Sequence, residues 1–232
     1  MSESAARLAV IIPALNEEQS VGRVIDAIPR HLAPDIVVVD NGSTDGTAEV
    51  ARAHGARVVS EPHRGYGAAC LAGLAALRDA DIIAFLDADL SDDPALLPDL
   101  IEPIVSGRAD LVIGSRMIGE REPGALPAHS RLGNWLAGMI LTHLYRQPTT
   151  DLGPFRAVRR EALERLEMAD RAFGWTMEMQ AKAARLRLPT VEVPVPYRRR
   201  IGRSKITGSL RASVQAGLII LATALRLLWW KP

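Results

Sequence analysis

Short apolar runs alternate with helical runs through the first half of the chain, and this alternation limits the fold more than any other feature. The apolar runs are rich in valine and isoleucine and have no polar side of their own, which is typical of parallel strands buried on both faces. The expected strands are 8–12, 36–39, 57–59, 82–86 and 111–113, and the expected helices are 21–28, 47–53, 68–77 and 95–105. The sequence therefore predicts an α/β fold with a mostly parallel central sheet flanked by helices.

The pattern is looser after Gly119. A Pro/Gly-rich stretch at 120–127 comes first, followed by expected helices at 132–145, 160–166 and 176–187 and a strand at 191–193. The stretch 149–157 is interpreted as a connection into the helix at 160–166. A chain of 232 residues is long enough for one large core. We expect one domain at 1–208 and an apolar C-terminal helix at 209–232.

Polar residues follow four of the expected strands directly. They occupy 13–18, 40–46, 87–89 and 114–116. The carboxyl ends of parallel strands meet at one edge of the sheet, where ligands bind in this class of fold. The residues at 41–45 also suit a turn and a helix cap. A cap alone does not explain polar residues at four strand ends, so we expect a binding crevice there.

Two carboxylates, Asp87 and Asp89, end the most apolar of these strands. Residues two apart on an extended segment project to the same side, so both side chains can reach one point. Paired carboxylate oxygens suit Mg²⁺ or Mn²⁺, with a phosphate completing the coordination shell. The alternative is a solvated strand end that leads into a helix cap at 92–94.

Other features exclude several classes. There is no P-loop, and the Gly65-Tyr66-Gly67 sequence lacks the third glycine of a dinucleotide-binding turn. The one cysteine, Cys70, excludes an internal disulfide. A net charge of +1 carries no information as a total, but 198–211 holds six basic residues and no acid.

Six motifs in order give the chain a resemblance to a known family. They are Ile12-Pro13-Ala14-Leu15-Asn16-Glu17-Glu18, Val38-Val39-Asp40-Asn41-Gly42-Ser43-Thr44-Asp45-Gly46-Thr47, Asp87-Ala88-Asp89-Leu90, Gly114-Ser115-Arg116, Gly153-Pro154-Phe155-Arg156-Ala157 and Arg199-x-x-Gly202-x-Ser204-Lys205. With these motifs the chain resembles family 2 glycosyltransferases of the GT-A nucleotide-diphospho-sugar transferase fold. More narrowly, it is similar to dolichyl-phosphate and polyprenyl-phosphate mannose and glucose synthases, over most of its length to about Gly208.

The resemblance implies a nucleotide-sugar donor and a divalent cation, Mg²⁺ or Mn²⁺. The residues implied in donor binding are Pro13, Ala14, Asn16, Glu17, Asp40, Asp87, Ala88, Arg199 and Lys205. Asp87 and Asp89 are the implied metal ligands. Ser91 stands where the family often has a glutamine, which leaves more of the coordination to water. Arg116, Arg199 and Lys205 would hold phosphates.

The implied activity is transfer of a hexose from a donor of the UDP-glucose or GDP-mannose type to a polyprenyl or dolichyl phosphate. The implied catalytic residues are Asp89, Arg116, Asp151 and Glu178. A phosphate acceptor needs little help from a base, whereas a hydroxyl acceptor would need a carboxylate such as Asp151 or Glu178. Glu178 can equally be a helix residue bonded to nearby backbone. A hydroxyl acceptor and a non-catalytic nucleotide-sugar-binding module therefore stay open as alternatives.

The basic segment and the tail both bear on membrane contact. Arg199 and Lys205 are expected at phosphates, and Arg198, Arg200 and Arg203 at the surface or facing a membrane; a protected strand edge and lipid headgroups are the alternatives. The uncharged run 212–225 precedes Trp229-Trp230-Lys231, which suits a helix lying in the membrane interface. Packing on the domain and a true span stay open.

We expect a cytoplasmic protein, because the N-terminus lacks the shape of a signal peptide. We expect it to be peripherally associated with the membrane, because of the apolar tail and because the resemblance implies work at the cytoplasmic membrane face. The expected partners are the nucleotide-sugar donor, a lipid-phosphate acceptor and the cytoplasmic membrane face, with no nucleic acid. A homo-oligomer stays open.

Overall fold

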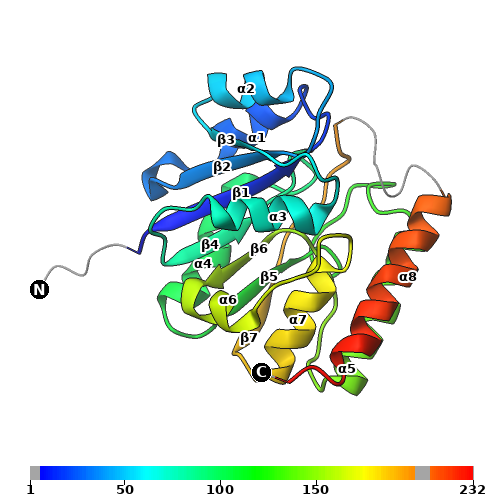
Figure 1. Ribbon diagram of the computed structural model, residues 1–232. Coiled ribbons are helices and arrows are strands. Elements are labelled where there is room, and N and C mark those ends of the chain that lie inside the picture. Colours follow the sequence, from blue (N-terminus) through cyan, green and yellow to red (C-terminus); the bar gives the residue numbers. More distant parts are fainter. Residues whose placement is uncertain (1–5, 202–209, 232) are drawn as a thin grey trace, which may run out of the picture.

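The computed structural model describes residues 6–201 and 210–231. A seven-stranded sheet of order β3-β2-β1-β4-β6-β5-β7 runs through these residues (Figure 1). Its strands are β1 (Leu8–Ala14), β2 (Asp35–Asp40), β3 (Arg57–Ser60), β4 (Ile82–Phe85), β5 (Leu111–Ser115), β6 (Arg156–Arg159) and β7 (Thr190–Pro194). The α-helices are α1 (Val21–Ala27), α2 (Thr47–Ala53), α3 (Tyr66–Ala75), α4 (Leu97–Val105), α5 (Ala128–Leu144), α6 (Arg160–Leu166), α7 (Trp175–Arg185) and α8 (Leu210–Leu227).

The sheet is mostly parallel, as predicted, with one exception. Strands β1, β2, β3 and β4 pair in parallel, and β5 pairs in parallel with β7. Strand β6 is antiparallel and lies between β4 and β5, with Ala157 opposite both Ala84 and Val112. The sequence analysis missed β6, because its four residues have an arginine at each end and no apolar run. The loop before β6 consequently arrives at the edge where β4 and β5 end.

The sheet is buried on both faces because adjacent residues of each strand contribute to different cores. On β1, Val10 and Ile12 pack into a core shared with α1 and α4, whereas Ile11 packs into a core shared with α3 and α7. All three side chains are fully buried. This two-sided burial explains the continuous apolar runs in the sequence.

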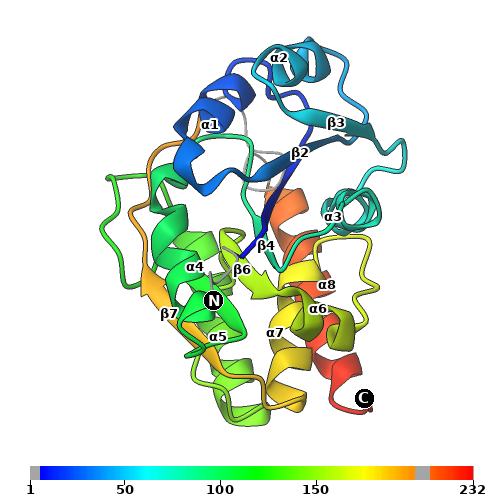
Figure 2. The ribbon, with the colours of Figure 1, turned by 90° about the vertical axis from the view of Figure 1, so that its left-hand side faces the viewer.

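A third, smaller core joins α5, α7 and α8 at the end of the molecule away from β2 and β3 (Figures 1 and 2). Leu141, Met177, Ala224 and Leu227 are buried in it. The Tyr145 hydroxyl donates a hydrogen bond to the Ala224 carbonyl. We call these three helices the helical lobe.

The C-terminal helix α8 packs on the domain by one face only. Arg185 of α7 donates to the carbonyls of Leu228 (3.0 Å) and Trp230 (2.8 Å), which fixes the end of the chain. On the opposite face, Leu218, Leu221, Leu225 and Trp229 are exposed. None of the helices in the described residues is long and apolar enough to cross a membrane. The predicted boundary at 208/209 lies outside those residues.

Candidate active site

The loops after β1 and β2 are tied together by side chains predicted for the donor site. The Asn16 side-chain oxygen accepts from the Thr44 backbone (2.8 Å), and the Asn16 backbone donates to the Ser43 hydroxyl (3.0 Å). Asp40 accepts from the Ser43 backbone at 3.0 Å. Glu17 is buried, and its backbone donates to the Thr47 hydroxyl (2.8 Å). These contacts bring Asn16, Glu17 and Asp40 to one edge of the sheet, as predicted.

The backbone of β1 continues this edge. Pro13 and Ala14 lie opposite Val39 and Asp40 in the parallel pair of β1 and β2. Asn41 extends the edge toward α3, because its amide nitrogen donates to the Glu61 and His63 carbonyls at 2.9 Å. The amide oxygen of Asn41 accepts from Gly65 (2.8 Å). Asn41 thus positions the loop before α3.

The two glycines before and within α3 serve packing, which explains a motif that lacked a third glycine. A Cβ on Gly65 would lie 2.1 Å from the Arg171 carbonyl oxygen, and one on Gly67 would lie 2.0 Å from that of Asp170. Both contacts are too short for any side chain. The Gly65-Tyr66-Gly67 sequence therefore lets α3 approach the 170–171 backbone closely.

Asp87 and Asp89 follow β4, and their carboxylates repel each other. Asp89 is almost fully buried and accepts from the Ser91 backbone at 2.9 Å. Asp87 reaches solvent in part, yet protein atoms surround its carboxylate densely. This burial, together with the negative charge of Asp89, raises the pKa of Asp87 to about 7. A positive ion between the two carboxylates would relieve the repulsion.

The pair is chemically suited to a divalent cation whose remaining ligands come from a bound phosphate. Among the described residues, no group of three or more His, Cys, Asp or Glu side chains could hold a metal by itself. Mg²⁺ in proteins commonly takes one or two carboxylates plus substrate phosphates and water. Asp87 and Asp89 fit that arrangement.

One arginine of the basic segment lies at this pair, and it differs from the predicted one. The Arg200 guanidinium is 2.8 Å from Asp89 and 3.2 Å from Glu17, so the expectation of a surface position for Arg200 is wrong. Arg199, expected at a phosphate, is exposed and donates to the Pro123 carbonyl at 2.9 and 2.6 Å. Arg198 pairs with Asp93 (2.6 Å). Lys205 and Arg203 lie outside the described residues.

Arg116 and Asp151 form a buried, bidentate ion pair. Two nitrogens of Arg116 lie 2.7 Å from the two Asp151 oxygens, and Arg116 packs over the Tyr197 ring. Burial alone would lower the pKa of Arg116, but Asp151 raises it, so the guanidinium stays charged. Glu192 of β7 accepts from the backbone of Thr150 and Asp151, which fixes the loop.

Glu178 makes contacts that hold a loop. Its carboxylate is buried, pairs with Lys182 (3.0 Å) and accepts from the backbone of Ala169 (3.1 Å) and Asp170 (2.7 Å). This is the arrangement of the structural alternative, a helix residue bonded to nearby backbone. A role as a base stays a prediction.

Asp92 is a site residue that the sequence analysis treated only as part of a helix cap. Asp93 is the residue that caps, accepting from Ala95 at 3.1 Å. Asp92 is buried, and neither of its carboxylate oxygens has a hydrogen-bond partner within the described part of the chain. Burial raises the pKa of Asp92, opposed by the charge of Arg116. The negative charges of Asp87, Asp89 and Asp151 raise the pKa of Asp92 further.

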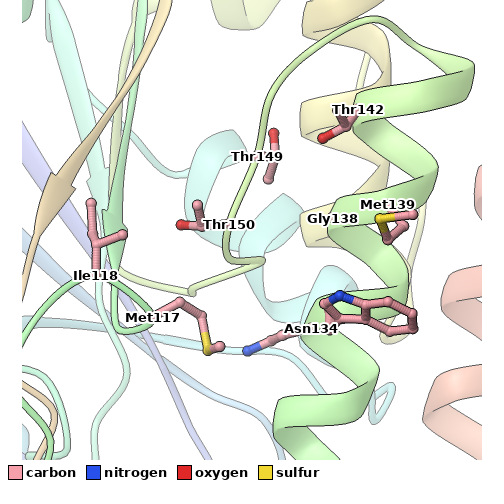
Figure 3. A pocket seen from close by; sticks show the side chains of 9 residues that line it. Met117, Ile118, Asn134, Gly138, Met139, Thr142, Thr149 and Thr150 are labelled. Carbon is pink, nitrogen blue, oxygen red and sulfur yellow. The ribbon is translucent and has the colours of Figure 1, made fainter.

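An apolar groove of about 310 Å³ opens between the end of β5 and α5 (Figure 3). Met117 and Ile118 line one side, Trp135 and Met139 of α5 line the other, and Thr149 and Thr150 are also in its wall. Met117 follows Arg116 in the chain, and Thr150 precedes Asp151. Two residues of the groove wall are thus chain neighbours of the buried ion pair.

Comparisons with known proteins agree with this geometry. The family model described as "Glycosyl transferase family 2" matches residues 9–167. An uncharacterized glycosyltransferase of Mycobacterium tuberculosis, Rv0539, is 43% identical over 210 residues, which cover 89% of this chain and 93% of that protein. The undecaprenyl-phosphate mannosyltransferase of Micrococcus luteus is 32% identical over 221 residues, covering 88% and 89% of the two chains.

Among solved structures, glucosyl-3-phosphoglycerate synthase from Mycobacterium tuberculosis, in complex with Mn²⁺, UDP and glucosyl-3-phosphoglycerate, is similar with a TM-score of 0.78 and 27% identity. The likeness covers 98% of this chain and 81% of that one. The chain therefore belongs to glycosyl transferase family 2 and is a glycosyltransferase of the GT-A fold, as its motifs predicted.

Proposed function

We propose that this glycosyltransferase moves a hexose from a nucleotide-diphosphate sugar to the phosphate of a polyprenyl- or dolichyl-phosphate lipid. The observation that carries the proposal is the apolar groove between the end of β5 and α5, whose wall includes Met117, the residue that follows Arg116 in the chain. An acceptor with an anionic head and a hydrocarbon tail matches a guanidinium followed by methionine, isoleucine and tryptophan side chains. The relative named as an undecaprenyl-phosphate mannosyltransferase supports the same acceptor class.

The donor would bind along the edge formed by β1, β2 and β4. The Asp40 and Glu17 carboxylates can accept hydrogen bonds from ribose hydroxyls or a base. Asp87 and Asp89 would hold a divalent cation, which when bound neutralises charge that grows on the departing diphosphate. The Mn²⁺ and UDP in the neighbouring enzyme's complex support a divalent cation and a nucleotide-sugar donor.

The acceptor phosphate would lie at Arg116. Because Asp151 already satisfies part of this guanidinium and holds it in one orientation, Arg116 would present its remaining donors in a fixed direction. A phosphate monoester is already anionic near neutral pH, so the residues here need to hold its charge and exclude water, without removing a proton. No base is therefore required of Asp151 or Glu178, whose carboxylates are already paired.

A membrane surface would deliver such an acceptor. The outer faces of α5 and α8 expose apolar side chains, among them Trp135, Leu136, Leu218 and Leu221. The stretches 123–150 and 193–232 contain no Asp or Glu. An apolar face flanked by basic residues and without acids favours binding to an anionic lipid surface. We therefore propose peripheral association at the cytoplasmic membrane face.

A second candidate is transfer to a hydroxyl of a small phosphorylated acceptor. It is favoured by the likeness to an enzyme whose structure holds glucosyl-3-phosphoglycerate. In that case Asp151 or Glu178 would have to leave its present ion pair to act as a base.

The test is a transfer assay with labelled UDP-glucose or GDP-mannose and Mn²⁺. Undecaprenyl phosphate in detergent, 3-phosphoglycerate and buffer alone serve as the three acceptor arms. Product only with the lipid phosphate supports the proposal, and product only with phosphoglycerate contradicts it.

A groove variant separates the two acceptors further. Met139→Glu places a charge in the groove, and Leu144→Glu places one at an exposed site of the same helix that does not line it. We expect the first to raise the KM for the lipid by roughly tenfold or more, because each lost apolar contact costs about 1–2 kcal/mol, and to leave the donor KM unchanged. The second should change neither.

A further inference from the structure

We infer that Arg200 is a built-in counter-ion of the donor site, which makes binding of the divalent cation depend on the nucleoside diphosphate. The inference rests on the proposed function only for the identity of these two ligands. Its starting point is the position of a guanidinium where the cation is expected.

The Arg200 guanidinium joins two carboxylates from different strand ends. One nitrogen lies 2.8 Å from an Asp89 oxygen and 3.2 Å from a Glu17 oxygen. The Asp89 and Glu17 side chains are 4% and 7% exposed, against 29% for Arg200. The arginine therefore covers the carboxylates from the solvent side and neutralises part of their charge.

The backbone around Arg200 holds the guanidinium there. The Ile201 N–H donates to the Asp89 carbonyl at 3.0 Å, and the Arg198 N–H donates to the Ser91 carbonyl at 2.9 Å. The residues on both sides of Arg200 are thus bonded to the very segment that carries Asp89. The ion pair is a fixed part of the site.

A divalent cation and this guanidinium compete for the same carboxylate. The metal would need an Asp89 oxygen that already faces the Arg200 guanidinium. A metal ion and a guanidinium on the same carboxylate repel each other strongly in a partly buried site. The free protein should consequently bind the metal weakly, even though Asp87 and Asp89 suit it.

A bound diphosphate would turn this competition between the metal and Arg200 into mutual support. Its negative oxygens can lie between the metal and the guanidinium and attract both. Within the described residues the Nε of Arg200 is buried and has no hydrogen-bond partner, so a phosphate oxygen could complete its donors. Metal and nucleotide would then strengthen each other's binding, and linkage makes the effect reciprocal.

Arg198 provides a matched control two residues away. It has the same side chain and also forms an ion pair, but its partner is Asp93 at 2.6 Å, outside the proposed metal ligands. Arg198→Gln removes a charge from the same segment and leaves Asp89 covered by Arg200.

The experiment measures Mn²⁺ binding to the full chain by the EPR signal of free Mn²⁺, with Mn²⁺ alone and with saturating UDP or GDP. We expect Arg200→Gln to bind Mn²⁺ alone roughly tenfold more tightly than the wild type, within the range typical of coupling between sites. The enhancement by nucleotide should shrink by the same factor. Arg198→Gln should match the wild type in both measurements.

Two further measurements keep the inference falsifiable if Arg200→Gln does not fold. Arg200→Met keeps an apolar stem without the charge and should behave like Arg200→Gln. In the wild type itself, Mn²⁺ and the nucleotide that binds should enhance each other's affinity at least severalfold, and independent binding would overturn the inference without any variant.

The outcomes separate this inference from the proposed function. If Mn²⁺ and nucleotide bind the wild type together but Arg200→Gln binds Mn²⁺ alone no more tightly, only the role of Arg200 is overturned. If neither UDP nor GDP binds with Mn²⁺ to any of the proteins, the proposed function fails, and the role of Arg200 fails with it.

Discussion

The sheet and the helical lobe treat their apolar side chains differently. In the sheet, residues such as Ile11, Val38 and Ile83 are at most 1% exposed, because helices cover both faces. In the helical lobe, Trp135 is 56% exposed and Leu218 is 61% exposed, although the same helices bury Leu141 and Ala224. The sheet has both faces covered, one of them partly by α7 of the lobe, whereas α5 and α8 have one face covered by the protein and one exposed.

The charged residues of the two regions also differ in their partners. At the sheet edge, acids and arginines from distant segments pair with one another, as Asp151 does with Arg116 and Asp89 with Arg200. In the lobe, Arg185 donates to the Leu228 and Trp230 carbonyls, and Glu178 pairs with Lys182 of its own helix. The sheet edge therefore presents paired charges, which suits the charged ligands proposed for it, and the lobe presents an apolar surface.

The largest expected effect concerns the sheet edge. Asp89→Ala removes a proposed metal ligand and the ion-pair partner of Arg200, so transfer should fall by roughly 10³-fold, the scale of losing one electrostatic contact in the transition state. The melting temperature should change little, because Asp89 follows β4 and is not part of the apolar core. Kinetics and thermal melting measure the two quantities.

Asp93→Ala is the matched control, since its carboxylate lies in the same segment and pairs with Arg198. It should keep most of the activity. Full transfer by Asp89→Ala, or by the wild type in excess EDTA, would contradict the role of the carboxylate pair.

The next effect tests whether the lobe is a separate unit of stability. Leu141→Ala removes a fully buried side chain from the small core, which costs about 2–5 kcal/mol. We expect α8 to open locally, with amide exchange rising in α8 and α5 while the amides of β1 and β2 stay protected. Hydrogen exchange read by mass spectrometry resolves these segments.

Val38→Ala in the sheet is the comparison variant. Because it should destabilise the whole fold, we expect it to raise amide exchange in all segments through global unfolding. Equal changes in both variants would show that the lobe and the sheet unfold as one. A chain ending at residue 208 should be less stable for the same reason as Leu141→Ala.

The open face of the lobe gives a smaller effect. Replacing Leu218, Leu221 and Leu225 by serine removes three exposed apolar side chains, each expected to contribute about 1 kcal/mol on partial burial in a lipid surface. Binding to anionic liposomes should weaken by roughly 100-fold. Raising the salt concentration should weaken wild-type binding without abolishing it, because apolar burial is not screened. Co-sedimentation measures both.

Val105→Ser is the control from the sheet half, since Val105 is 64% exposed on α4. It should leave liposome binding unchanged. A wild-type protein that ignores anionic liposomes would contradict the proposed membrane contact.

The smallest effect concerns Asp92. Burial raises its pKa in the folded protein, so the folded state binds more protons than the unfolded state, and wild-type stability falls as pH rises above the ordinary carboxyl range near 4. Asp92→Asn cannot ionise and should therefore stabilise the protein more at pH 8 than at pH 5. Melting temperatures at the two pH values test this, and an equal shift at both would contradict it. Asp93→Asn is the control for a less buried neighbour.

Much of the sheet half could be predicted because its information is local. Continuous apolar runs marked β1, β2, β4 and β5. The period of two did not apply to Asp87 and Asp89, because β4 ends at Phe85 and Asp89 lies in a turn. Strand β6 could not be predicted, because its pairing with β4 and β5 depends on residues 40 or more positions away, and its buried Arg156 is satisfied by carbonyls of Leu152, Gly153 and Thr176.

The basic segment shows the limit for site residues. Composition predicted cations near phosphates, but three consecutive arginines look alike in sequence. The backbone pairing of 198–201 with 89–91 decides that Arg200 faces Asp89 while Arg199 turns to Pro123. Asp92 and Asp93 are a similar case, since burial alone distinguishes them.

The reversed direction of β6 has a consequence for how this protein can change. The chain leaves the sheet at the end of β5 and returns to it at the start of β6, and Ile113 lies directly opposite Arg156 in the ladder. Everything between them, including α5 and the groove, is thus one chain segment whose two ends are neighbours in the sheet. A relative can have a longer, shorter or different segment between β5 and β6 while β1, β2 and β4 keep their positions. Under the proposed function, changes confined to this segment would alter acceptor preference and leave the strands of the donor site unchanged.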